Sequence, residues 1–96
     1  MKICTTEFPD EVSQYENAIA SLALHVSKTE PDLLILAEMP FTPWIFHVDD
    51  FSEDTWSNTV KNHAELLDRL DELIPTPLIT SRPITVDGLN LNQAIY

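Results

Sequence analysis

The chain has 96 residues, of which 44% are hydrophobic, and a formal net charge of −11 at pH 7. This length allows a single domain with a small core, and the hydrophobic fraction is too high for a disordered chain. The five basic residues form no cluster, so the acidic surface should repel nucleic acids and anionic membranes. We therefore expect neither nucleic acid nor a membrane as a partner.

The cysteine and glycine contents indicate the cellular compartment of the protein and exclude one type of ligand-binding loop. Cys4 is the one cysteine, so no internal disulfide can form, which is typical of the reducing cytoplasm. The amino terminus lacks a signal-peptide pattern, and the longest apolar run, 33–37, is far too short to span a membrane. Because Gly88 is the single glycine, a phosphate-binding glycine loop is excluded. These features predict a cytoplasmic protein without a cofactor.

Two amphipathic helices are predicted. The first follows a short strand over 3–5, begins at Pro9 and Asp10, and has its apolar residues three and four positions apart. The second follows a loop over 42–54 and is expected to be capped by Ser52 or by Asp54. The apolar face of the first helix is Val12, Tyr15, Ile19, Leu22, Ala23 and Val26. The apolar face of the second is Trp56, Val60, Ala64, Leu67, Leu70 and Ile74.

Three further strands complete the pattern. The second is predicted over 33–37, the third over 78–81 and the fourth over 89–96, after a turn at Asp87-Gly88. The order β-α-β-α-β-β indicates an α/β fold with a mainly parallel sheet. Its strands are apolar on both faces, so both faces need a cover. Either each helix covers one face, or both helices cover the same face and a second sheet covers the other.

The residue after the second strand is the main candidate for chemistry. Glu38 directly follows the apolar run 33–37, at the end of a strand where open α/β sheets place their ligand crevice. Phe41 and Trp44 are candidate walls of a substrate pocket, although they could equally pack beneath the loop as core. Such walls would shelter the Glu38 carboxylate from water and suit it to act as a general base. A structural carboxylate that caps the loop or pairs with a basic group is the alternative.

The same segment resembles a known family. Residues 31–41, Pro-Asp-Leu-Leu-Ile-Leu-Ala-Glu-Met-Pro-Phe, are similar to the first catalytic block of the nitrilase, or carbon–nitrogen hydrolase, superfamily. In that family an apolar strand ends in Pro-Glu or a close variant, and the Glu is the general base. Here Ala37 stands in place of the usual Pro, and Pro40 and Pro43 stand where many members have none.

The resemblance implies a fold and a reaction. The fold is an α-β-β-α sandwich of the nitrilase type, of which residues 1–96 would be the incomplete amino-terminal part of one domain. The reaction is cleavage of a non-peptide C–N bond in a nitrile or an amide by a Glu-Lys-Cys triad, with Glu38 as the general base. The family's Lys and Cys positions lie beyond Tyr96, and Lys61 and Cys4 match no motif, so the chain alone is expected to be inactive. We expect the intact enzyme to bind a small nitrile or amide and to be a homo-oligomer.

Other functions remain open. The chain could be a small acidic α/β module that binds a protein partner without catalysis, with Glu38 as a contact residue. A thiol enzyme that uses Cys4 with Glu38 is a third hypothesis, which a Cys4→Ser change would test. His47 beside Asp49 and Asp50 is one histidine near acids, not a ligand set, so no metal site is predicted. The remaining histidines, His25 and His63, are expected at a helix edge or on the surface.

Overall fold

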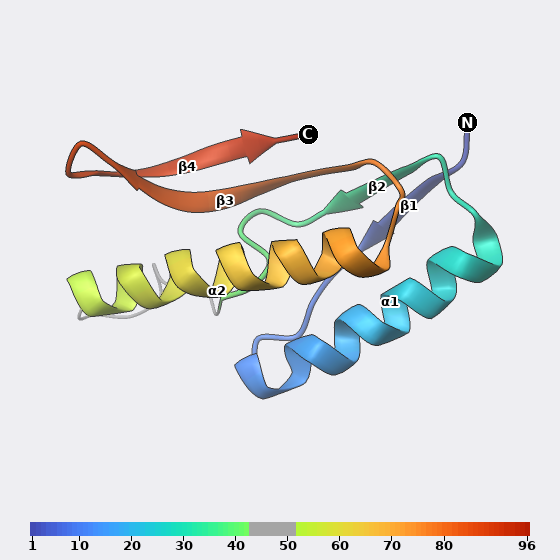
Figure 1. Cartoon of the computed structure of the whole chain (residues 1–96), viewed down its shortest axis with the longest axis horizontal. Coiled ribbons are helices and arrows are strands. Elements are labelled where there is room, and N and C mark those ends of the chain that lie inside the picture. Colours follow the sequence, from blue (N-terminus) through green and yellow to red (C-terminus); the bar gives the residue numbers. More distant parts are fainter. Residues whose placement is uncertain (43–51) are drawn as a thin grey trace.

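The computed structural model describes residues 1–42 and 52–96. In chain order the elements are β1 (Ile3–Thr6), the 3-10 turn η1 (Val12–Gln14), α1 (Tyr15–Thr29), β2 (Leu33–Leu36), α2 (Glu53–Leu73), β3 (Leu78–Val86) and β4 (Leu89–Ile95). They form a small mixed α/β domain with a four-stranded sheet and two helices (Figure 1). The predicted order β-α-β-α-β-β is therefore confirmed.

The sheet is mixed: two of its three strand pairings are parallel, as predicted, and the longest pairing is antiparallel. Its strand order is β1-β2-β3-β4, with β1, β2 and β3 parallel and β4 antiparallel to β3. Asp87 and Gly88 connect β3 to β4 with φ angles of 51° and 78°. Two successive positive φ angles are typical of the type I′ turn, whose twist matches that of the strands beside it. The turn predicted at Asp87-Gly88 is confirmed.

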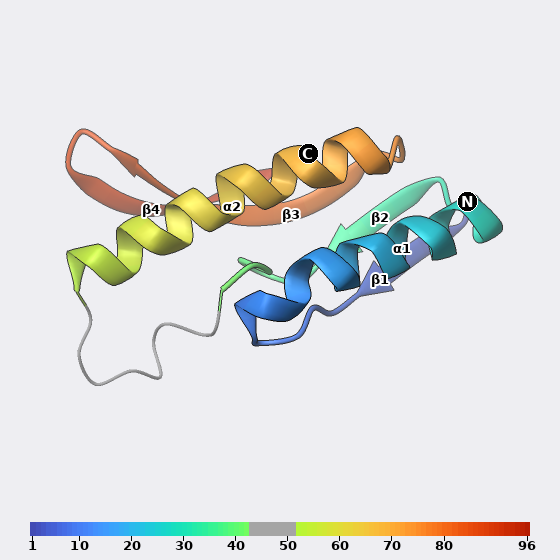
Figure 2. The ribbon, with the colours of Figure 1, turned by 60° about the horizontal axis from the view of Figure 1, so that its bottom comes forward.

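Both helices cover the same face of the sheet. Figure 1 shows α1 and α2 together on one side of the strands, and Figure 2 shows them both in front of the sheet. Of the two arrangements that the sequence allows, the structure therefore has the one that leaves a sheet face for another cover. The main core between the helices and the sheet consists of Tyr15, Ile19, Leu22, Val26, Leu34, Leu36, Phe41, Leu70 and Ile74.

The opposite face of the sheet is apolar and partly open. Leu34 and Leu36 of β2 are buried beneath the helices, so the alternation of side chains directs Ile35 away from them. The register places Ile35 beside Ile79 of β3, and it places Ile3 of β1 beside the half-buried Leu33. Ile3 is 52% exposed and Ile79 is 40% exposed. We call the face formed by Ile3, Leu33, Ile35 and Ile79 the open face.

The first helix begins later than predicted. Residues 12–14 form a 3-10 turn, in which the Gln14 N–H donates to the Glu11 carbonyl over 3.0 Å, and α1 begins only at Tyr15. The tighter winding of this turn rotates Val12 off the helix face, and its side chain is 53% exposed. The prediction of a helix from Pro9 was therefore wrong at its start. The rest of the predicted face is buried or half-buried.

The second helix begins as predicted but buries a different set of residues. The Thr55 N–H donates to the Ser52 hydroxyl over 3.1 Å, which confirms Ser52 as the cap. Ala64 was expected inside and is exposed, whereas Thr59 and His63 are buried. The surface or helix-edge position predicted for His63 was therefore wrong. A search for apolar residues alone misses polar side chains that find partners inside the protein.

The third strand is longer than predicted. The sequence placed its end at Ser81, but β3 continues through Pro83 to Val86. Only Leu78 and Ile79 pair with β2, so among the described residues β4 is the only strand that pairs with β3 beyond that point. A proline is tolerated there because one side of the strand needs no backbone donor.

Within residues 1–42 and 52–96, no helix is long and apolar enough to cross a membrane.

Candidate functional site

Glu38 lies in a turn that leaves the carboxyl end of β2. We call residues 37–41 the Glu38 turn. Two side chains of β3 hold its beginning: the Thr80 hydroxyl donates to the Ala37 carbonyl over 3.0 Å, and the Met39 N–H donates to the Ser81 hydroxyl over 3.0 Å. Met39 has a φ of 41°, in the left-handed region that non-glycine residues rarely adopt. These hydrogen bonds stabilise that backbone conformation.

A side chain of β4 contacts the carboxylate itself. The Asn92 Nδ2 donates to the Glu38 Oε1 over 2.6 Å. Since a carboxylate is a strong acceptor, this hydrogen bond fixes the direction of the Glu38 side chain. Glu38 is nevertheless exposed, and the sheltered position expected from the sequence is not found among the described residues. Glu38 lines a surface depression together with Ile79 of the open face, and its side chain stays in contact with solvent there.

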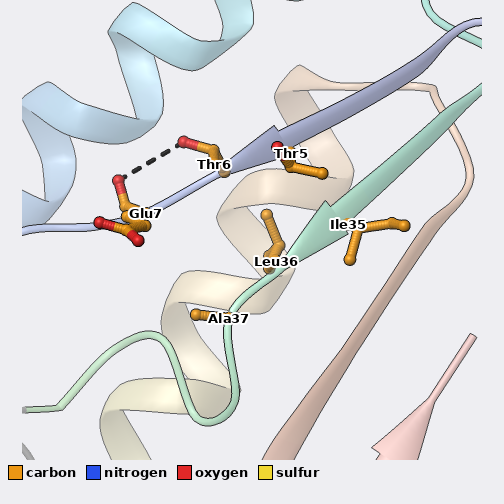
Figure 3. Close-up of a pocket in the computed structure, with 6 residues that line it drawn as sticks. All are labelled: Thr5, Thr6, Glu7, Ile35, Leu36 and Ala37. Carbon is orange, nitrogen blue, oxygen red and sulfur yellow. Dashed lines mark hydrogen bonds between the residues drawn. The ribbon is translucent and has the colours of Figure 1, made fainter.

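Two depressions flank the end of β2. One, of about 460 Å³, lies between the ends of β1 and β2 and is lined by residues 5–7 and 35–37 (Figure 3). The other, of about 290 Å³, includes Glu38, Asn92 and Ile79 of the open face. Open α/β sheets bind their ligands at this edge, beyond the carboxyl ends of parallel strands. Glu38 therefore lies at the carboxyl edge of the parallel strands, beside a depression that Asn92 and Ile79 also line.

Glu7 is a second acidic residue at the same edge of the sheet, and it was not predicted from the sequence as a site residue. It directly follows β1, whose last residue, Thr6, pairs with Leu36 at the end of β2. Figure 3 shows Glu7 among the side chains that line the first depression. The pattern that singled out Glu38, an acidic residue just after a predicted strand, also applies to Glu7.

Phe41 lies in the core. Its side chain is fully buried, and its ring centroid lies 4.9 Å from that of Phe8, 5.7 Å from that of Tyr15 and 5.7 Å from that of His63. This environment gives Phe41 a packing role, and a substrate contact by its ring stays a prediction. The second predicted wall, Trp44, lies outside the described residues.

His63 is the functional candidate that the sequence analysis missed. Its ring is fully buried, its Nδ1 lies 2.7 Å from the Thr59 carbonyl, and its Nε2 accepts from the Phe41 N–H over 3.1 Å. Burial lowers the pKa of His63 below its ordinary value of 6.5, more than the backbone groups of Thr59 and Met39 raise it. The imidazole is therefore neutral at pH 7. The sequence signal that could have indicated its burial is helical spacing: His63 lies four residues after Thr59 and seven after Trp56, and both of these residues are buried.

The other candidate residues lie apart from Glu38 or outside the described chain. Lys61 is exposed on α2, and Cys4 of β1 is half-buried beside Leu34, so the strand register does not bring its thiol to Glu38. Within the described ranges, no three His, Cys, Asp or Glu side chains are placed to hold a metal ion. His47, Asp49 and Asp50 fall in residues 43–51, which are not described. His25 is exposed on α1, as predicted.

Comparisons with known proteins found no relative: no protein-family model, curated protein or solved structure matches the chain. A functional assignment therefore depends on the residues and the architecture of this chain.

Proposed function

We propose that this chain is the amino-terminal part of a carbon–nitrogen hydrolase of the nitrilase type and that Glu38 is the general base. The observation that carries the proposal is the position of Glu38. It leaves the carboxyl end of a buried apolar strand, and Asn92 holds its carboxylate at the edge of the sheet. A carboxylate at a ligand crevice with a fixed direction is suited to take a proton from a bound nucleophile.

The architecture supports the same proposal. In an α-β-β-α sandwich, each sheet has helices on one face and packs on the other sheet with its second face. This chain has α1 and α2 on one face and the apolar side chains of the open face, Ile3 and Ile79 among them, on the other. One helix layer and one sheet are half of such a sandwich. A second sheet on the open face would also exclude water from the depression that contains both Ile79 and Glu38.

The proposed reaction uses a thiol nucleophile. The Glu38 carboxylate takes the proton from a cysteine thiol, and the thiolate attacks the carbon of a nitrile or an amide to form a covalent intermediate. A lysine ammonium stabilises the negative charge that develops on the substrate. Glu38 gives the thiol proton to the substrate nitrogen, which leaves as ammonia or an amine; for a nitrile, a first water molecule adds before the ammonia leaves. The Glu38 carboxylate then takes a proton from the water that hydrolyses the intermediate, and this proton returns to the cysteine thiolate as the acid product leaves. The cysteine and the lysine belong to a segment downstream of Tyr96, and the intact enzyme is proposed to be a homo-oligomer.

The coding DNA beyond the Tyr96 codon provides the first test. A reading frame that continues, with a Lys after the next predicted strand and a Cys after a later one, is the expected result. A stop codon directly after Tyr96 would mean that the chain never acquires a nucleophile at the proposed position, and the hydrolase assignment would be wrong.

A second candidate function is a non-catalytic module that binds a protein partner. The exposed apolar side chains of the open face favour it, because patches of this kind often mark interaction sites. The two candidates differ in how residues 1–96 behave alone. A monomer with a cooperative thermal transition supports the module, whereas aggregation supports an incomplete sandwich.

A further inference from the structure

The two partners of the His63 ring define its protonation state. The Thr59 carbonyl can only accept, so Nδ1 carries the hydrogen of the 2.7 Å contact. The Phe41 N–H can only donate, so Nε2 carries no hydrogen. Both contacts are satisfied only by the neutral tautomer with its proton on Nδ1. His63 therefore connects α2 to the Glu38 turn through one specific form of its ring.

The groups around the ring are mostly backbone and aromatic. They are the Thr59 carbonyl on α2, the Phe41 N–H and the Met39 backbone in the Glu38 turn, and the ring of Phe41. On the far side of Phe41, α1 contributes Tyr15, whose pKa is raised by burial first and by Asp10 second, so that the phenol is neutral.

The charged residues that are close to His63 or to the Glu38 turn in the sequence have their side chains in solvent or bonded to another strand. Lys61 and Glu65 of α2 are exposed, and the Glu38 carboxylate bonds to Asn92 on β4. A proton added to His63 would therefore find no opposite charge among the described residues that surround it.

A second proton on the ring would break the contact with the turn. Protonated Nε2 would place its own hydrogen against the Phe41 N–H, so that two donors face each other in a buried site. An unpaired buried donor destabilises the folded state, and a buried charge without a partner destabilises it more. The Met39 backbone beside the ring raises the pKa of His63, but burial lowers this pKa by more.

We propose that His63 is a pH-sensitive latch on the Glu38 turn: its neutral ring holds the Phe41 backbone, and its protonation releases this end of the turn, while Thr80 and Ser81 continue to hold the beginning. Phe41 is three residues from Glu38, and the strained φ of Met39 lies between them. The latch does not depend on a hydrolase activity. If the proposed hydrolase function is correct, His63 is a positioning residue that acts on the general base through the backbone.

Nuclear magnetic resonance of the 96-residue chain tests the latch without any activity. The imidazole nitrogens report the tautomer, and the Phe41 amide reports its hydrogen bond as the pH is lowered from 8 until the His63 ring has titrated. We expect the Nδ1-protonated tautomer at pH 8. On acidification the Phe41 amide resonance should move with the same midpoint as the His63 ring, and amide exchange at Phe41 should accelerate by at least about tenfold relative to its intrinsic rate.

The matched variant is His63→Gln, because the Gln Oε1 can replace Nε2 as an acceptor but does not titrate. In this variant the Phe41 amide should stay protected and lose its titration. His25→Gln, at an exposed position of α1, should leave the titration of Phe41 unchanged.

Several results would overturn the latch: a proton on Nε2 at pH 8, a Phe41 amide that ignores the titration of His63, or a Phe41 titration that persists in His63→Gln. Loss of protection at the core amide of Ile19 at the same midpoint would also overturn it, since the protein would then unfold as a whole. The wild-type titration decides the matter if His63→Gln does not fold.

Discussion

Asn92 of β4 and Glu38 of the turn after β2 are joined by a 2.6 Å hydrogen bond between side chains that lie 54 residues apart in the chain. Only the fold brings them together, because β3 lies between the two strands in the sheet. The contact couples the candidate general base to the β3–β4 hairpin. It also gives Glu38 a fixed direction in spite of its exposure.

A double-mutant cycle measures this contact. We expect Asn92→Ala and Glu38→Ala to show a coupling free energy of about 0.5–1 kcal/mol in urea unfolding, because one exposed hydrogen bond contributes little more. Asn58→Ala, at an exposed position of α2, should show no coupling to Glu38→Ala. A zero coupling for the Asn92 pair would mean that water replaces the contact in solution.

The packing role of Phe41 predicts a large effect on stability. Phe41→Ala should lower the free energy of unfolding by about 3–5 kcal/mol, because it removes a fully buried ring and leaves a cavity among Phe8, Tyr15 and His63. Leu24→Ala, at a position of α1 that is 57% exposed, is the control and should change stability by less than about 0.5 kcal/mol. Chemical denaturation measures both. A small effect of Phe41→Ala would instead favour a substrate-contact role for this ring.

The open face should govern self-association of the isolated chain. Ile79→Thr replaces an apolar side chain of this face by a polar one that suits a strand, so the variant should associate less than the wild type in sedimentation velocity. Leu24→Thr changes an exposed leucine on α1, away from the sheet, and should leave association as it is. If the two variants behave alike, the open face is not the surface through which the chains associate.

The buried His63 predicts an acid-sensitive fold. Because its pKa is lowered in the folded state, the unfolded chain binds more protons at acidic pH, so folding stability falls as the pH drops below about 6.5 and continues to fall until the lower, folded-state pKa is passed. Well above pH 6.5, where the residue is neutral in both states, it contributes no pH dependence. Urea unfolding from pH 8 to pH 5 should show the slope in the wild type and a smaller slope in His63→Gln. An equal slope in both would assign the acid sensitivity to other groups.

Local signals in the sequence were sufficient for much of the fold. The apolar run before Glu38, the cap at Ser52 and the turn at Asp87-Gly88 are each defined by a few neighbouring residues, and the structure has all three elements. The choice between one helix on each face and both on one face was not local. It depends on how α1 and α2 pack on the sheet, which periodicity alone does not determine.

The candidate site shows the same difference between features set by neighbouring residues and features set by the three-dimensional fold. The position of Glu38 at the end of a strand follows from the run that precedes it, so the sequence was enough to predict it. Its partner Asn92 required the strand order and the register of the hairpin. The burial of His63 required its two backbone partners, one of which, the Phe41 N–H, lies 22 residues away. Polar residues inside a core carry no apolar signal, and their partners become visible only in three dimensions.

The proposed role of Glu38 is tested by ammonia release from a panel of small nitriles and amides, measured with the protein expressed from the whole reading frame. Glu38→Gln keeps the size of the side chain and removes the base, so kcat/KM should fall by at least about 100-fold while urea unfolding changes little. Glu65→Gln, at an exposed position of α2, should retain wild-type turnover. Wild-type turnover in a folded Glu38→Gln enzyme would show that Glu38 is not the general base.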